Sequence, residues 1–219
     1  MERPFAFWAG AGPALWTGAC DDRSADAMVR EEMDRMKVFL DFEASSLSDQ
    51  SYPVEVAWVF QDGRTESHLI RPAPGWTDWS PDAEAIHGLS RAKLEEEGQP
   101  HDVVAARMIE ALSDHELFAS APSWDGKWLS VLLRGAGLPC HALRLRDTDE
   151  ALRSTATDIL QAVIPGARLD AEVHALVSAA NAARSAHPAH RALADALGEY
   201  ETWCRVRQAA RAVPRPPSI

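Results

Sequence analysis

The 219-residue chain has few cysteines, no long apolar run and no excess of basic residues. Its three cysteines, Cys20, Cys140 and Cys204, lie far apart without a C-x-x-C spacing. This excludes a disulfide framework and is typical of the reducing cytoplasm. A zinc site built on Cys140 and His141 lacks further ligands at a suitable spacing. Because no apolar segment is long enough to span a membrane, we expect a cytoplasmic protein with no membrane partner.

The charge balance is acidic, with 33 acidic against 22 basic side chains and a formal net charge of −11. A protein that holds nucleic acid only through a basic face would have the opposite balance. An acidic chain is compatible with a nuclease whose carboxylates are offset locally by metal ions. The length and the apolar fraction of 46% are those of one well-packed globular domain.

Residues 1–35 differ in composition from the rest of the chain, because a Gly-, Ala-, Pro- and Trp-rich stretch is followed by a strongly charged one. Glycine and proline interrupt the apolar part, which argues against a secretory signal. The expected divisions are a poorly ordered extension or an upstream start at residues 1–35, a folded domain at residues 36–212 and a frayed tail at residues 213–219.

The domain begins with a pattern of strands. An apolar run over residues 38–40 leads into Asp41 and Glu43, which is typical of a buried strand that ends at a loop. A second run, over residues 54–60, is rich in β-branched and aromatic residues and ends at Asp62-Gly63, a hairpin signal. The remaining expected strands are residues 67–70, 117–120 and 143–146.

Helical signals fill the remainder. Ser80 followed by Pro81 indicates an N-cap and a first helical position, and Ser90 indicates a second cap. The longer expected helices cover about residues 103–112, 125–133, 150–163, 170–183 and 191–212. Three consecutive strands, then two more among helices, predict an α/β fold with a mixed five-stranded sheet flanked by helices.

The first strand brings two acids to one face. Residues i and i+2 of a strand project the same way, so Asp41 and Glu43 point together while Phe42 points to the opposite face. Two like charges held this close are unfavourable unless they are neutralised, and a divalent metal ion does so. Taken alone, a D-x-E at a strand end is more often a pair of solvated acids.

Two later elements carry further candidate groups. Asp125 lies between Trp124 and Trp128 where a strand passes into a helix, a position that the helix dipole alone favours for an acid. His190 and Asp195 are five residues apart, which on a regular helix separates them by about 140°. They meet only if the histidine lies at the entry to the helix and turns inwards.

Together these motifs resemble the DEDDh 3′–5′ exonucleases, a ribonuclease H-like family that includes oligoribonuclease, ribonuclease T and polymerase proofreading subunits. D-F-E, W-D and H-x-x-x-x-D occur in the family's order between about Lys37 and Trp203, and Ile86-His87-Gly88-Leu89-Ser90 is similar to its H-G-I-T loop. The resemblance implies a catalytic set of His190 as general base and the metal ligands Asp41, Glu43, Asp125 and Asp195. It implies substrate-binding residues at Ala44, Ser45, Ser46, Leu47, His87, Trp124 and Trp128.

The resemblance also implies a reaction. Four carboxylates would hold two Mg²⁺ or Mn²⁺ ions, which stabilise the attacking and leaving oxygens of a phosphodiester, while a histidine accepts the proton of water. The expected activity is 3′–5′ hydrolysis of single-stranded DNA or RNA ends with release of nucleoside 5′-monophosphates. A second copy of the chain is a further candidate partner.

Departures from the family pattern leave alternatives open. Ala44-Ser45-Ser46 stands where the family commonly has Thr-Thr-Gly or Ala-Thr-Gly, and Ala121 where it commonly has Asn, so the choice of DNA or RNA is open. A nucleic-acid-binding or regulatory module without catalysis and a small-nucleotide phosphodiesterase are the alternatives. Trp76 and Trp79 either stack on unpaired bases or cover the sheet edge. A serine nucleophile is excluded because no G-x-S-x-G elbow is present.

Overall fold

The computed structural model describes residues 35–183 and 190–214. The expectations for residues 1–34, for the break at Pro188 and for residues 215–219 lie outside the described residues. The described residues belong to one compact unit that begins at Arg35. None of the helices in these two ranges combines the length and the apolar character that crossing a bilayer requires.

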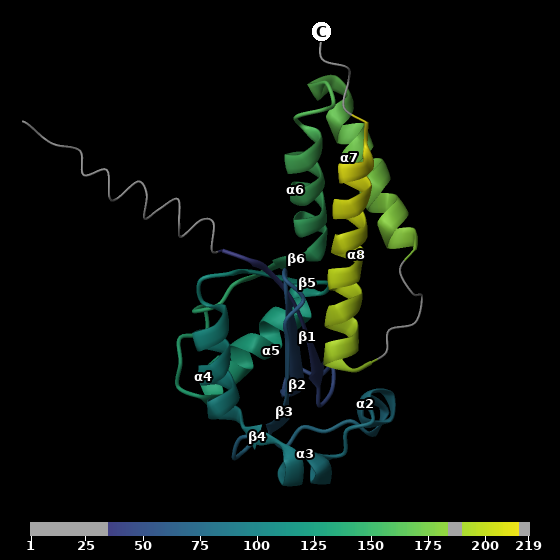
Figure 1. The fold of residues 1–219 in the computed structure, drawn as a ribbon. Helices are drawn as coiled ribbons and strands as arrows, with labels where there is room; N and C mark the ends of the chain where they lie inside the picture. The colour runs from purple at the N-terminus through teal and green to yellow at the C-terminus, as the bar shows by residue number, and fades with distance from the viewer. Residues whose placement is uncertain (1–34, 184–189, 215–219) are drawn as a thin grey trace, which may run out of the picture. The chain divides into compact units, whose positions relative to one another are not determined.

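A six-stranded sheet in the order β4-β3-β2-β1-β5-β6 forms the centre of this unit (Figure 1). β1 to β3 are antiparallel neighbours, whereas β5 runs parallel to β1, β6 parallel to β5 and β4 parallel to β3. The strands are β1 (Lys37–Ala44), β2 (Pro53–Phe60), β3 (Thr65–Arg71), β4 (Gln99–Pro100), β5 (Glu116–Ala119) and β6 (Leu145–Asp147).

The predicted mixed α/β class is confirmed, but the predicted number of five strands is one too few. The additional strand, β4, has two exposed residues, one of them a proline. A segment this short carries no alternation of apolar and polar residues, and proline cannot donate to a ladder, so the sequence pattern gives no sign of it.

Helices cover both faces of the sheet. α4 and α5 pack on one face, whereas α6 and α8 pack on the other and α7 packs against these two helices (Figure 1). The predicted caps Ser80 and Ser90 are confirmed, because their hydroxyls accept from the backbone N–H groups of Ala83 and Lys93. The helices are α2 (Pro81–His87), α3 (Arg91–Glu97), α4 (His101–Leu112), α5 (Pro122–Gly135), α6 (Thr148–Leu160), α7 (Gly166–Ala182) and α8 (Ala192–Ala212).

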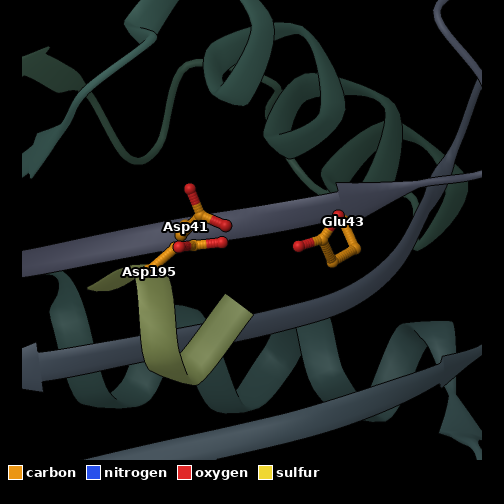
Figure 2. Close-up of side chains that lie close together, drawn as sticks. All are labelled: Asp41, Glu43 and Asp195. Atoms are coloured by element: carbon orange, nitrogen blue, oxygen red, sulfur yellow. The ribbon is translucent and has the colours of Figure 1, made fainter. Parts of the chain in front are cut away.

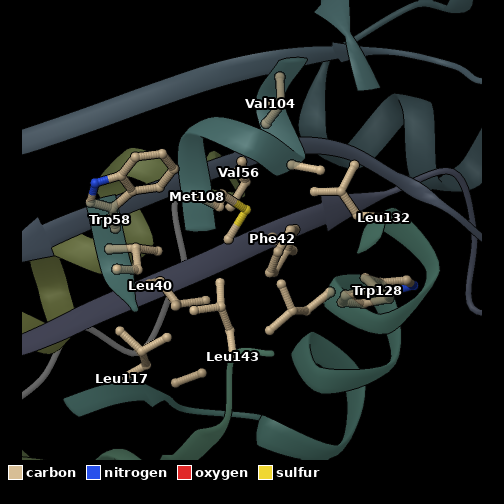
Figure 3. Close-up of a cluster of buried hydrophobic side chains, with 14 of the residues drawn as sticks. Leu40, Phe42, Val56, Trp58, Val104, Met108, Leu117, Trp128, Leu132 and Leu143 are labelled. Carbon is tan, nitrogen blue, oxygen red and sulfur yellow. The ribbon is translucent and has the colours of Figure 1, made fainter. Parts of the chain in front are cut away.

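The alternation of side chains along β1 divides the core. Leu40 and Phe42 point into the apolar cluster beneath α4 and α5 (Figure 3). Phe39 points the other way and packs against Phe118, with ring centroids 5.9 Å apart, in the cluster beneath α6, α7 and α8. Because the period is two, Asp41 continues the face of Phe39. The acids of β1 therefore face the helical layer that contains α8.

The two tryptophans of the loop before α2 have structural contacts. Trp76 stacks on Tyr52, with ring centroids 5.1 Å apart. The indole N–H of Trp79 donates to Glu84 Oε2 over 2.7 Å. Both are half-buried against the third, smaller apolar cluster. These contacts favour the alternative in which the two rings cover the sheet rather than stack on bases.

Candidate active site

Three carboxylates from two elements converge above the end of β1. One oxygen each of Asp41, Glu43 and Asp195 lies within 4.8 Å of the other two (Figure 2). The two acids of β1 share a face, as their spacing predicts, and Asp195 comes from the first turn of α8. The pairing of β1 with β2 shifts register between Glu43 and Ala44. Such irregularities bend a strand locally and redirect its side chains.

The electrostatics of this cluster oppose ionisation. Burial raises the pKa of Asp41 well above its ordinary value, and the nearby acids Asp125, Glu43 and Asp195 raise it further. Burial also raises the pKa of Glu43 to about 8, with further contributions from neighbouring acids and an opposing one from Arg191. Without a cation Glu43 therefore keeps a proton at neutral pH, and a divalent ion would take its place.

Asp125 lies beside the cluster rather than within it. It occupies the first turn of α5 with 2% of its surface exposed. Burial raises its pKa to about 7, although the backbone of Phe42 and Ala121 opposes the rise. Within the described ranges no hydrogen-bond partner reaches its Oδ2 atom. A buried carboxylate oxygen without a partner, next to three clustered carboxylates, is a donor set that fits a hard divalent cation.

His190 lies at the entry to α8, as the spacing from Asp195 requires. Its side chain is exposed and its backbone has φ +52°, the left-handed region. The close group of carboxylates among the described residues does not include it. Its role as general base stays a prediction.

The loop after β1, where the resemblance implies nucleotide contacts, is held by a neighbouring acid. The hydroxyls of Ser45, Ser46 and Ser48 all donate to the carboxylate of Asp78, over 3.2 Å for Ser45 and 2.8 Å for Ser48. These bonds, that from Ser46 above all, hold the pKa of Asp78 below its ordinary value. Leu47 projects from the loop with 71% of its surface exposed.

The other residues implied in substrate binding differ in exposure. Trp128 is a core side chain whose indole N–H donates to Ser51 Oγ over 3.0 Å. His87 is buried, its Nδ1 accepts from the N–H of Leu89, and burial lowers its pKa. Trp124 is 39% exposed and packs on Trp128 with ring centroids 5.7 Å apart. Of these three rings, that of Trp124 offers the largest surface to a ligand.

Two buried acids near the site were missed by the sequence analysis. Glu55 on β2 is 2% exposed, and Glu199 on α8 is 1% exposed. Glu199 raises the pKa of both Asp41 and Asp125. The position of Glu55 inside the otherwise apolar run of residues 54–60 could have marked it as a buried acid. For the second, the signal was a spacing of four residues from Asp195, which places both on one helix face.

The six-stranded mixed sheet between two helical layers is a fold that this chain shares with solved structures of exonuclease I. Residues over 80% of this chain superpose on the zinc-bound complex of E. coli exonuclease I with single-stranded DNA, with a TM-score of 0.57 and 15% identity. A second exonuclease I structure gives a TM-score of 0.57 at 16% identity, again over 80% of this chain. A moderately thermophilic exonuclease I from Methylocaldum szegediense gives 0.56 at 18% identity over 80%.

These similarities establish the fold, and the resemblance to DEDDh exonucleases is confirmed at that level. The matched region covers 41% of the first and third exonuclease I chains and 42% of the second, so this chain spans about two-fifths of their length. No family model and no curated protein sequence matches this chain. Activity must therefore be argued from the residues of the site.

Proposed function

We propose that this chain is a metal-dependent 3′–5′ exonuclease that releases nucleoside 5′-monophosphates from single-stranded nucleic acid ends. The observation that carries the proposal is the convergence of Asp41, Glu43 and Asp195 within 4.8 Å. It occurs in a fold that exonuclease I shares, and exonuclease I of E. coli has been solved with dA16 and dT13 oligonucleotides. Free thiols at Cys140 and Cys204, among the described residues, are compatible with a cytoplasmic location.

Each residue of the site has a role in this proposal. Asp41, Glu43 and Asp195 would bind two Mg²⁺ or Mn²⁺ ions, and Asp125 would complete the set through its buried Oδ2 atom. Such ions supply Lewis-acid stabilisation of the charge that develops on the phosphodiester oxygens and lower the pKa of bound water. His190, which lies exposed at the entry to α8, would accept the proton of the attacking water.

Substrate contacts would come from the surface around these acids. The exposed face of Trp124 would stack on a base, and Lys127, whose Nζ lies 5.1 Å from that ring centroid, would place a positive charge nearby. The exposed Leu47 would contact the terminal nucleotide from the loop after β1. The hydroxyls of Ser45 and Ser46 already donate to Asp78, so these two serines would shape the loop rather than donate to the substrate.

The test uses 5′-labelled single-stranded RNA and DNA with Mg²⁺, Mn²⁺ or EDTA. We expect a metal-dependent ladder that shortens from the 3′ end, lost in Asp41→Ala and retained in Asp170→Ala, which removes an exposed acid of α7. The polymer cleaved faster identifies the substrate. Binding without cleavage would instead support the regulatory module, and cleavage confined to dinucleotides would support the small-nucleotide phosphodiesterase.

A further inference from the structure

Glu55 joins the central sheet to the start of the helix that carries Asp195. Its carboxylate accepts from Arg191 Nη2 over 2.7 Å and from Arg191 Nε over 3.0 Å. It also accepts from the backbone N–H of Ala192 over 3.1 Å. All three bonds end at the N-cap and the first residue of α8, so one side chain of β2 holds the entry of the helix.

The burial of Glu55 has a cost that requires compensation. A carboxylate removed from water loses several kcal/mol of hydration, which is regained only with good geometry and further hydrogen bonds. Both are present, because the guanidinium binds both oxygens and a backbone amide supplies a third bond. Separating Arg191 from Glu55 would leave a buried carboxylate without its partner, so positions of Arg191 away from Glu55 are strongly disfavoured.

The helix relies on this external acid for its cap. Arg191 occupies the N-cap position of α8, and in the described chain its side chain does not bond the free N–H groups of the first turn. A helix start needs an acceptor for these groups, and it is usually a neighbouring Ser, Thr, Asp or Asn. Glu55 provides it from another element. Capping and docking of α8 are therefore one interaction.

The hydrogen bonds of Glu55 to Arg191 and Ala192 lie between the acids of β1 and Asp195 of α8. Glu55 pairs with Glu43 in the β1–β2 register, on the same face of the sheet. On the helix side, the carbonyl of Arg191 accepts from the N–H of Asp195 over 3.1 Å, one turn later. A continuous series of contacts therefore links the acids of β1 to Asp195 by way of Glu55 and Arg191.

We propose that Glu55 is a positioning residue that, through Arg191 and the amide of Ala192, holds Asp195 at the distance from Asp41 and Glu43 that binding of a divalent ion needs. The inference rests on the proposed function in so far as the acids bind metal. Residues that orient metal ligands without touching the metal typically change metal affinity or activity by about 10–100-fold.

A second ion pair of the same geometry provides a matched control. Glu66 of β3 binds Arg107 of α4 through Nε over 2.9 Å and Nη2 over 3.2 Å. Glu66 pairs with Trp58 in the register, and Trp58 belongs to the cluster beneath α4 and α5. This pair therefore fastens a helix to the sheet on the face opposite Asp41 and Glu43.

The experiment compares Glu55→Gln, Arg191→Lys and Glu66→Gln in the full chain. Mn²⁺ affinity is measured by titration calorimetry, and kcat and KM are measured with a labelled oligonucleotide. We expect Glu55→Gln to weaken Mn²⁺ binding about 10–100-fold and to lower kcat with little change in KM. Arg191→Lys keeps the positive charge but loses the planar guanidinium that binds both carboxylate oxygens. Its Mn²⁺ affinity and kcat should therefore fall less than those of Glu55→Gln. Glu66→Gln should leave both quantities within about twofold, even if its melting temperature falls.

Hydrogen exchange of the amides of residues 192–196, measured in the same samples, tests whether Glu55 holds the start of α8. Together with the Mn²⁺ titrations it distinguishes failure of the positioning role from failure of the proposed function. Faster exchange in Glu55→Gln than in Glu66→Gln is the expected result. If the wild type binds Mn²⁺ but Glu55→Gln binds it equally well, the positioning role is wrong and the proposed function stands. If the wild type binds no Mn²⁺, the proposed function fails and Glu55 serves no metal centre. The exchange data would then show only whether it fastens α8.

Discussion

Glu43 and Glu55 face each other directly across β1 and β2, yet their surroundings differ. Glu55 lies 2.7 Å from the guanidinium of Arg191, which compensates its charge. For Glu43, burial and then the surrounding acids raise the pKa to about 8. Like charges directly opposite in a sheet are destabilising. One acid of the pair therefore has a structural partner, and the other is placed to bind a proton or a cation.

The stability of the metal-free protein should fall as pH rises towards 8. The pKa of Glu43 is 4.5 ordinarily and about 8 in the fold, so between these values the folded state keeps a proton that the unfolded state releases. The free energy of unfolding then decreases with pH across this window and levels off above it. Asp125, with a pKa raised to about 7, acts in the same direction. Thermal melting in EDTA from pH 5 to 9 measures the effect.

Two comparisons test whether Glu43 causes this decrease of stability with pH. Glu43→Gln should flatten it and raise the melting temperature at pH 8 by about 2–4 °C for each kcal/mol of relieved repulsion and burial. Mn²⁺ should stabilise the wild type more at pH 8 than at pH 5, because it binds the ionised carboxylates. A melting temperature in EDTA that increased from pH 6 to 8 would contradict the assignment.

The sequence predicted those parts of the molecule that depend on local rules. The period of two places Asp41 and Glu43 on one face, and side-chain caps at Ser80 and Ser90 begin α2 and α3. The hairpin at Asp62-Gly63 follows from its turn residues, and Gly63 has φ +89° as this turn requires. Each of these features is set by residues no more than a few positions apart.

Contacts between distant segments could not be predicted in this way. Asp78 bonds serines about thirty residues earlier, and Arg191 lies 136 residues from Glu55. Neither acid belongs to a motif, so nothing in the local pattern connects it to its partner. The same limit applies to Trp124 and Trp128. Their sequence surroundings do not show which of the two rings is buried, because tertiary packing decides it.

Replacement of His190 should affect turnover but not metal binding. His190 lies outside the close group of carboxylates in the part of the chain that the structure describes, so His190→Ala should leave Mn²⁺ affinity within about twofold. Loss of a general base should lower kcat by about 10²–10⁴-fold. His174→Ala, which removes an exposed histidine of α7, is the control. Full activity of His190→Ala across pH 6–9 would show that the base lies elsewhere.

Trp124 and Trp128 should differ in what their removal costs. Trp124 is exposed, so Trp124→Ala should weaken oligonucleotide binding by about 1–3 kcal/mol while stability changes little. Trp128 fills the core, so Trp128→Ala should lower the free energy of unfolding by about 3–5 kcal/mol. Fluorescence anisotropy and urea denaturation separate the two effects. Equal loss of binding in both variants, at matched folded fraction, would favour the sequence-based prediction that both contact substrate.

Release of the loop after β1 should weaken substrate binding without changing metal affinity. Asp78→Ala removes the acceptor of three serine hydroxyls, each bond to a charged group contributing about 1.5–3 kcal/mol at most. Because these bonds lower the pKa of Asp78, their contribution is complete at neutral pH and is lost as pH falls below its ordinary value of 3.8. We therefore expect a several-fold higher KM at pH 7.5, with Mn²⁺ affinity unchanged.

Asp49→Asn provides the matched control for this change, since Asp49 is an exposed acid of the same loop. It should leave KM as in the wild type. The KM of both variants is measured on the polymer that the wild type cleaves faster, and Mn²⁺ affinity by calorimetry. Because Asp78 contacts the loop through Ser45, Ser46 and Ser48 and not the clustered acids, a loss of Mn²⁺ affinity in Asp78→Ala would mean that the loop supports the metal ligands. An unchanged KM would mean that the loop does not contact the substrate.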